Sequence, residues 1–247
     1  MICPIINIIA VSYHRPNDFE LCIQSVIDNT DLPYKLTIID NSSGGIDTSL
    51  NKYRKHANIT IIKNNTNLGK GKSFKKYYKS ICGNDDVYFV SLDADVIVPP
   101  NWLSKLITLI MDINIPFAAI APVLIRDNND SFDKQIRNGD IYMHGGTDNF
   151  SQLKKINKNL YATKSVAGPL LLLSCKFYKL IGGYPGDTLY GHDDGFICNK
   201  AIEYGHFVGI TDIIECVHSN IDNTEEYQNW KLSNINNIST KFGYWDF

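Results

Sequence analysis

Apolar runs of strand length alternate with segments of helical periodicity along the first half of the chain. The runs cover 5–11, 34–39, 59–63 and 87–92, and the last of them shows no polar alternation, as in a strand buried on both faces. The segments after them place apolar residues at helical spacing and cover 19–28, 48–56, 73–82 and 102–113. Asn17 or Asp18 is the expected N-cap of the first helix. This alternation predicts an α/β fold with a mostly parallel sheet flanked by helices.

The second half of the chain is less regular. Strands are predicted at 117–124, 170–173 and 207–217, with helices at 176–181 and from the acidic segment near 193 to 204. Between them, 126–161 is polar and irregular, apart from short runs such as 141–143, and a loop of this length is often functional, so it is predicted to set specificity. The tail carries apolar and aromatic residues at helical spacing over 227–238.

Two carboxylates follow one of these predicted strands, an apolar run with β-branched and aromatic members. Val87 to Leu92 leads directly into Asp93-Ala94-Asp95. Open α/β sheets bind ligands at the carboxyl ends of their strands, and acids placed there are costly without a cation. Oxygen ligands of this kind suit hard divalent ions such as Mg²⁺ or Mn²⁺. An isolated Asp-x-Asp more often reflects two solvated carboxylates before a turn, here before Pro99-Pro100, so the preceding strand is what favours a site.

Composition excludes several classes of protein. The chain has 247 residues, 44% of them hydrophobic, and a formal net charge of −2, which predicts one compact domain without a general attraction to nucleic acid or anionic membranes. The sequence contains neither an apolar stretch of membrane-spanning length nor the pattern of a signal peptide. The six cysteines are scattered without a C-x-x-C pair, which favours reduced, buried thiols. We therefore expect a cytoplasmic protein, with peripheral membrane contact as the alternative.

A series of short motifs follows in order between residues 5 and 218. They read Val11-Ser12-Tyr13-His14-Arg15-Pro16, Ile38-Ile39-Asp40-Asn41, Asn67-Leu68-Gly69-Lys70, Asp93-Ala94-Asp95, Gly182-Gly183-Tyr184, Asp193-Asp194, Gly205 and His218. Each motif alone is loose, but together their order and spacing resemble the GT-A nucleotide-sugar glycosyltransferases, most closely family 2.

The resemblance implies a fold, an activity and binding partners for the chain. The fold would be a Rossmann-like GT-A domain over 1–218, with a nucleotide-sugar-binding half at 1–98, an acceptor and catalytic half at 99–218, and a tail at 219–247. The activity would be transfer of a sugar, with inversion, from a nucleoside diphosphate sugar, by analogy a UDP-sugar, to an acceptor hydroxyl. The acceptor could be a glycan, a lipid, a protein or a modified nucleobase, which leaves nucleic acid as a partner only in the acceptor role.

The same resemblance implies roles for individual residues. Donor binding is implied for Ser12, Tyr13, Arg15, Asp40, Asn67, Gly69, Lys70, Asp93 and Ala94. Asp93, Asp95 and His218 would hold Mn²⁺ or Mg²⁺, and Gly168, His192 and Asp193 would contact the acceptor. In inverting sugar transfer a carboxylate takes the acceptor proton, and Asp194 is the first choice for that base, with Asp193 as the other catalytic candidate.

The acidic pair departs from the family pattern, and three other functions remain open. Asp193 stands where the family usually has Glu, and Gly195-Phe196 replace a further acid, so the division of roles between Asp193 and Asp194 stays open. A retaining enzyme would use the same metal site. A nucleotidyltransferase would need a glycine-rich loop after the first strand, which 12–16 lacks. A non-catalytic sugar-nucleotide-binding module is disfavoured by the presence of both acid pairs.

A lysine cluster accompanies the Asn-Leu-Gly motif. Lys72, Lys75, Lys76 and Lys79 fall on one face of the predicted helix, opposite Phe74. A solvated helix face explains this pattern best, and a seat for an anionic acceptor is the functional alternative.

Overall fold

The structure is a computed structural model. It describes residues 5–77, 81–83, 87–111, 113–126, 153–186, 189–191, 193–219 and 221–242, with the backbone alone for 126 and 235–242. Most of the predicted specificity loop, the short pairing predicted at 141–143 and the predicted acceptor residue His192 lie outside the described residues.

Four parallel strands from the first half of the chain form one side of the sheet. β1 (Ile6–Ser12) lies between β2 (Tyr34–Asp40) and β4 (Tyr88–Asp93), and β2 also pairs with β3 (Ile59–Lys63). The register sets Ser12 beside Asp40 and Val11 beside Asp93, so the carboxyl ends of three strands meet at one edge. We call this the carboxyl edge of the sheet, and the predicted donor loops follow directly from it.

The second half of the chain continues the same sheet with mixed directions. β9 (Leu170–Ser174) runs antiparallel between β4 and β6 (Phe117–Arg126), while β10 (Phe207–His218) is parallel to β6. Two short strands, β7 (Lys154–Asn157) and β8 (Leu160–Thr163), complete the strand order β3-β2-β1-β4-β9-β6-β10-β8-β7. A third short strand, β5 (Val96–Ile97), pairs with β10 outside this order. The α/β class is confirmed. The parallel pairs lie mainly in the first half, and the β7–β8 hairpin falls where an irregular segment was expected.

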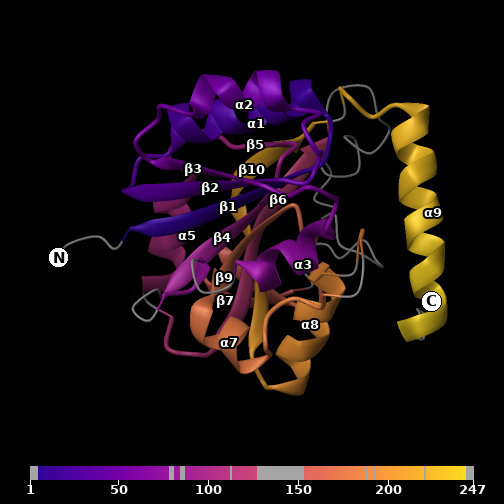
Figure 1. The fold of residues 1–247 in the computed structure, drawn as a ribbon. Coiled ribbons are helices and arrows are strands. Elements are labelled where there is room, and N and C mark those ends of the chain that lie inside the picture. The colour runs from indigo at the N-terminus through magenta and orange to yellow at the C-terminus, as the bar shows by residue number, and fades with distance from the viewer. Residues whose placement is uncertain are drawn as a thin grey trace.

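Helices cover both faces of the sheet, as Figure 1 shows. One face packs against α1 (Pro16–Asn29), α2 (Asp47–Tyr53) and α5 (Trp102–Met111), and the other against α3 (Gly69–Lys76), α7 (Cys175–Leu180) and α8 (Asp193–Glu203). Successive strand residues point to opposite faces, so Ile8 joins the first core and Ile9 the second. The five cysteines of the described residues are buried, as the sequence predicted, while their reduced state stays a prediction.

The first helix begins earlier than predicted, and its expected N-cap is wrong. Arg15 occupies the N-cap position with φ of 60°, and Pro16 starts the helix. Proline is favoured there because its fixed φ suits the first helical position and its missing N–H would have no helical partner. Asp18 is therefore inside the first turn, where its fully buried carboxylate is free to bind other elements.

Those other elements belong to the segment that leads into α9 (Glu225–Phe242). The Asp18 carboxylate accepts hydrogen bonds from the backbone N–H of Ile221 at 3.2 Å and of Asp222 at 2.9 Å, and from the hydroxyl of Ser219. In return, the Asp222 carboxylate accepts the N–H groups of Asn17 at 2.7 Å and Asp18 at 3.1 Å. We call this reciprocal set the Asp18–Asp222 clamp. It fixes the start of α9, which Figure 1 shows in yellow along one side of the molecule.

No helix in the described part of the chain has the length and apolar character needed to cross a membrane.

The glycine in the middle of α3 provides a test of the packing. A Cβ at Gly71 would meet the carbonyl oxygen of Pro185 at 1.9 Å, and backbone cannot swing aside as a flexible side chain can. Gly71→Ala is expected to lower the free energy of unfolding by about 2–3 kcal/mol, the upper part of the range for overpacking. Alanine's helix preference over glycine, about 1 kcal/mol, offsets only part of the strain.

Chemical denaturation of Gly71→Ala and Gly186→Ala measures this difference. Among the described residues, the added Cβ at Gly186 meets lysine methylenes alone, Lys75 Cδ at 3.3 Å and Lys72 Cγ at 3.6 Å, so this control should unfold near the wild-type midpoint. Equal stability of the two variants would show that the contact between α3 and Pro185 is looser than described.

Candidate functional site

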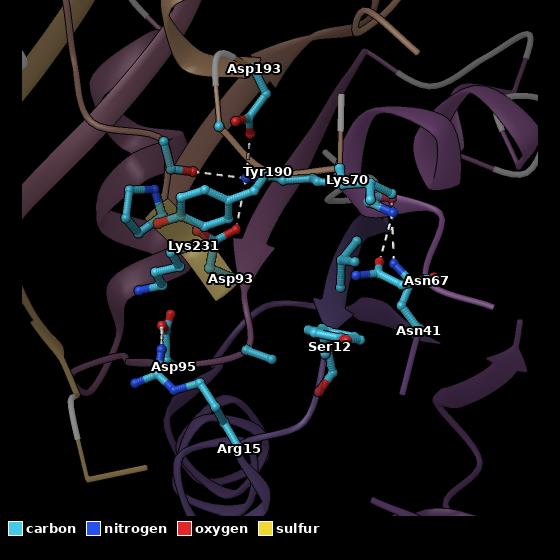
Figure 2. Close-up of a pocket in the computed structure, with 18 of the residues that line it drawn as sticks. Ser12, Arg15, Asn41, Asn67, Lys70, Asp93, Asp95, Tyr190, Asp193 and Lys231 are labelled. Atoms are coloured by element: carbon cyan, nitrogen blue, oxygen red, sulfur yellow. Dashed lines mark hydrogen bonds and ion pairs between the residues drawn. The ribbon is translucent and has the colours of Figure 1, made fainter. Parts of the chain in front are cut away.

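A cavity of about 480 Å³ opens at the carboxyl edge of the sheet. It is lined by the loops after β1, β2 and β4, the start of α3, the segment before β9, the start of α8, the end of β10 and the first turns of α9. Thirteen of the predicted site residues line it, namely Ser12, Tyr13, Arg15, Asn67, Gly69, Lys70, Asp93, Ala94, Asp95, Gly168, Asp193, Asp194 and His218. Residues more than 200 positions apart in the chain therefore converge on one cavity, as Figure 2 shows for part of its lining.

Strand pairing brings His218 to Asp95. His218, the last residue of β10, pairs with Val96 in β5, and the N–H of Ser219 donates to the carbonyl of Asp95 at 2.8 Å. The His218 Nε2 atom then lies 3.3 Å from Asp95 Oδ2. The second oxygen, Asp95 Oδ1, is buried and has no hydrogen-bond partner among the described residues. A buried carboxylate oxygen without a partner is costly. Together with a nearby imidazole, it fits a divalent cation.

Lys70 connects the first acid of the Asp-x-Asp motif to the acidic pair. Its ammonium lies 2.8 Å from Asp93 Oδ1 and 3.0 Å from Asp193 Oδ2, and donates to the carbonyl of Gly168 at 3.1 Å. Figure 2 shows Lys70 between the two acids. Burial opposes the charge of Lys70, but the carboxylates of Asp193 and Asp93 outweigh it and raise the pKa of Lys70. For Asp93 burial outweighs the attraction of Lys70, so its pKa is raised.

Asp93 thus faces Lys70 while Asp95 faces His218. Among the residues that the structure describes, no group of three or more His, Cys, Asp or Glu side chains is arranged to hold a metal ion. Asp95 and His218 are the adjacent pair of candidate ligands, and Asp93 is the one turned toward a lysine.

Arg15 holds the other oxygen of Asp95. Its guanidinium contacts Asp95 Oδ2, donates to Asp18 Oδ2 from Nε at 2.9 Å, and donates to the carbonyl of Ser219 at 2.9 Å. Burial raises the pKa of Asp95, but His218 and Arg15 outweigh that effect and lower it. Arg15 lines the cavity, yet only 7% of it is exposed, and its described hydrogen bonds are made to two acids and a backbone carbonyl of the protein itself.

The two neighbouring acids Asp193 and Asp194 have different surroundings. Asp193 pairs with Lys70, whereas Asp194 accepts the N–H of Gly168 on Oδ2 at 3.1 Å and the N–H of Gly195 on Oδ1 at 2.7 Å. A Cβ at Gly168 would lie 3.0 Å from the Cβ of Asp194, so a glycine is needed for this close approach. Both acids stand at the first turn of α8, where the helix dipole favours negative charge.

The residues expected to bind the donor line the cavity, with the exception of Asp40. Asn67 accepts the N–H of Gly69 at 2.8 Å and so shapes the turn that opens α3, which begins four residues before the predicted start. Asp40 stands at the predicted strand end but is fully buried, and its Oδ1 accepts the N–H of Ser42 at 2.7 Å. The next residue, Asn41, lines the cavity in its place, so donor contact by Asp40 stays a prediction.

The lysine face of α3 lies outside the cavity. Lys72, Lys75 and Lys76 are exposed and opposite the buried Phe74, as the spacing predicted, while Lys79 lies outside the described residues. Lys76 donates to Asn64 Oδ1 at 2.9 Å, and none of the three lines the cavity, which favours a solvated surface.

Several residues of the cavity wall were missed from the sequence, among them three on the tail helix and one tyrosine before α8. Tyr190 precedes α8, and Tyr227, Trp230 and Lys231 come from α9. The tail helix was predicted from the spacing of its apolar and aromatic residues, but that pattern does not say what the helix faces. The spacing of 227, 230 and 231, which puts three residues on one side of a helix, was the available signal.

Comparisons with known proteins agree with this geometry. The sequence profile described as "Glycosyl transferase family 2" matches residues 7–176. A curated protein of Haemophilus influenzae, described as "Uncharacterized glycosyltransferase", is 25% identical over 146 residues, which are 57% of this chain and 44% of that protein. The chain therefore spans less than half the length of this relative.

Three solved structures share the fold of this chain. GalNAc-T7 with UDP, GalNAc and Mn²⁺ has a TM-score of 0.66 at 18% identity, over 87% of this chain and 44% of that chain. The mannosyltransferase PcManGT of Pyrobaculum calidifontis with GDP-Man and Mn²⁺ has a TM-score of 0.65 at 16% identity, over 98% of this chain and 65% of that chain. TarS 1-349 of S. aureus with UDP-GlcNAc has a TM-score of 0.64 at 12% identity, over 87% and 58%. At such identities the likeness shows the fold alone.

Proposed function

This chain belongs to glycosyl transferase family 2, and we propose that it transfers a sugar from a nucleoside diphosphate sugar to an acceptor hydroxyl with inversion at the anomeric carbon. One observation carries the proposal. A single cavity contains two residues suited to bind a cation, Asp95 and His218, on its proposed donor side. On its proposed acceptor side it contains a buried carboxylate, Asp194, next to Gly168. Sugar transfer needs both, because negative charge develops on the leaving diphosphate while a proton leaves the acceptor.

Asp95 and His218 are the residues that we propose hold a divalent ion, Mn²⁺ or Mg²⁺, with Asp93 as the third candidate. The unpartnered oxygen of Asp95 supports this assignment. When bound there, such an ion would neutralise negative charge on the leaving diphosphate. Lys70 lies between the proposed donor-side acid Asp93 and the proposed acceptor-side acid Asp193, and so joins the two sides of the cavity.

Asp194 is the proposed general base. The acceptor oxygen bonds to the anomeric carbon as the bond from that carbon to the diphosphate oxygen breaks. The hydroxyl proton passes to the Asp194 carboxylate, and the electron pair of the broken bond leaves on the diphosphate. The two backbone N–H groups of Gly168 and Gly195 orient the carboxylate for this transfer. Asp193 would contact the acceptor beside it, together with Gly168 and His192.

The donor is proposed from the similar structures, which contain UDP, UDP-GlcNAc or GDP-Man. A UDP-sugar is the first choice and a GDP-sugar the second. The acceptor is a hydroxyl compound whose class, whether glycan, lipid, protein or modified nucleobase, is left to experiment.

A screen of UDP- and GDP-sugars by thermal shift, with and without Mn²⁺, tests the function. One donor is expected to raise the melting temperature only when Mn²⁺ is present, since a ligand that binds the folded state stabilises it. The same donor should then release nucleoside diphosphate, and NMR of the product should show the anomeric configuration opposite to that of the donor.

Each of the other possible results of this screen would indicate a different function. Release of pyrophosphate would indicate a nucleotidyltransferase, and a retained anomer would indicate a retaining transferase. Donor binding without turnover in the presence of a range of acceptors would indicate a binding module. No stabilisation by any donor would contradict the proposed function as a whole.

A further inference from the structure

The first turns of α9 form a wall of the cavity that joins its two sides. Trp230 lies 4.7 Å from the ring of Tyr13, which follows β1, and 5.8 Å from the ring of Tyr190, which precedes α8. Tyr227 stacks on Trp230 at 5.8 Å with an interplanar angle of 16°. We call Tyr227, Trp230 and Lys231 the α9 wall. It connects the nucleotide side of the cavity to the acceptor side.

Lys231 is held in this wall by two aromatic rings. Its ammonium lies 4.7 Å from the ring centroid of Tyr227 and 5.5 Å from that of Tyr190. Cation–π contacts of this length are attractive and grow stronger as the site loses water. Burial raises the pKa of Tyr227 to about 12, so the ring is that of a neutral phenol at neutral pH. The rings thus fix the position of the charge at the cavity wall.

The charge of Lys231 acts on the donor side of the cavity. Figure 2 shows Lys231 between Tyr190 and Asp95, with its side chain extending toward the acid. Lys231, Asp95 and His218 line the same cavity. Lys231 therefore faces the place where the proposed ion and the diphosphate would meet.

The wall is also tied mechanically to the acids. The Asp18–Asp222 clamp holds the start of α9. Arg15 connects Asp95 to the segment before α9, because its guanidinium contacts Asp95 and donates to the carbonyl of Ser219. The guanidinium carbon of Arg15 lies 5.3 Å from the ring centroid of Tyr227. The position of Lys231 is thus set by the same loop that holds Asp95.

We propose that Lys231 binds the diphosphate of the nucleotide donor and stabilises it as it leaves, with Tyr190 and Tyr227 as its positioning residues. The inference rests on the proposed function and adds to it a residue from a helix that lies beyond residues 7–176, the part matched by the family profile. Lysine suits this role because its compact ammonium binds phosphate as a point charge. Arg15 and Lys70 line the same cavity, so Lys231 brings a third cation to a site that receives a polyanion.

Calorimetric titration of the full chain with UDP and with GDP, each with Mn²⁺, tests the proposal. For the diphosphate that the wild type binds, Lys231→Met is expected to weaken affinity by about ten- to a hundredfold, the scale of one hydrogen bond to a charged group. Lys231→Arg should restore most of it. The dependence of affinity on salt should become shallower in Lys231→Met, because an ionic contact is lost.

Two controls separate charge from packing. Lys35→Met makes the same change at an exposed lysine on β2, whose register position opposite Asn7 puts it away from the carboxyl edge, and it should bind like the wild type. The corresponding nucleoside, followed by ligand-detected NMR, should bind Lys231→Met and the wild type equally, because it has no phosphate.

The outcomes are distinct. Wild-type affinity for the diphosphate in Lys231→Met, or an equal loss for the nucleoside, would overturn the role of Lys231 while leaving the proposed function intact. If the wild type binds neither UDP nor GDP, the proposed function fails and this inference fails with it.

Discussion

Asp194→Asn is expected to lower turnover by about two to four orders of magnitude, the usual contribution of general-base catalysis. Asparagine keeps the size of the side chain but cannot accept the acceptor's proton. If the base acts only in the transition state, the rate constant falls while donor affinity stays near that of the wild type. Single-turnover kinetics with a saturating donor, together with titration of the nucleoside diphosphate, measures the two quantities separately.

The structure also predicts a small side effect of this substitution. Both carboxylate oxygens of Asp194 accept backbone N–H groups, from Gly168 and from Gly195. Asparagine has one acceptor oxygen, so one N–H would face its amide group instead. We therefore expect a lower melting temperature in the variant, and donor affinity is the readout that shows the site itself is still formed.

Asp193→Asn is the matched control for the assignment within the pair. It removes one of the two carboxylates beside Lys70 and leaves Asp93 in place. We expect a weaker effect on turnover than that of Asp194→Asn. The opposite order would move the general base to Asp193, and the contact between Asp194 and Gly168 would then have a purely structural role.

Local patterns in the sequence predicted the elements and the chemistry that depend on neighbouring residues. β4 is mostly buried and almost continuously apolar, and it was predicted to within one residue. The edge strand β3 was predicted at its observed bounds from its β-branched residues. Because strand ends meet at one edge, placing Asp93 and Asp95 after β4 was sufficient to locate the cavity. The family resemblance then added His218, whose approach to Asp95 depends on the pairing of β10 with β5 and could not be read from spacing.

Contacts between distant segments could not be predicted from the sequence, and the reason is physical. Arg15 was expected to reach the donor, yet it pairs with Asp95 and Asp18, because the left-handed backbone at Arg15 and the buried carboxylates determine where its guanidinium goes. The spacing of Tyr227 and Trp230 predicts a helix but contains no information about which surface that helix covers. The Asp18–Asp222 clamp that orients α9 joins residues about 200 positions apart, and no local pattern shows it.

Asp95→Ala is expected to reduce metal-dependent binding of the nucleoside diphosphate by more than about a hundredfold, beyond the loss typical of residues that only support a ligand. The variant removes the buried oxygen that has no partner among the described residues and leaves His218 as a single weak ligand. The fold should survive, because Arg15 keeps its ion pair with Asp18 at 2.7 Å and its bond to the carbonyl of Ser219.

Calorimetric titration with UDP or GDP and Mn²⁺ measures the effect, and a melting curve without ligand checks the fold.

Asp93→Ala is the informative comparison, since the Asp93 carboxylate faces Lys70 at 2.8 Å. If Asp95 and His218 hold the ion, Asp93→Ala should retain more of the Mn²⁺ dependence than Asp95→Ala. Equal losses would make Asp93 a ligand of the same rank, and that would require its carboxylate to leave Lys70 when the ion binds. Unchanged affinity in Asp95→Ala would remove the cation site from this edge of the sheet, because no other described pair combines an unpartnered buried carboxylate oxygen with a nearby imidazole.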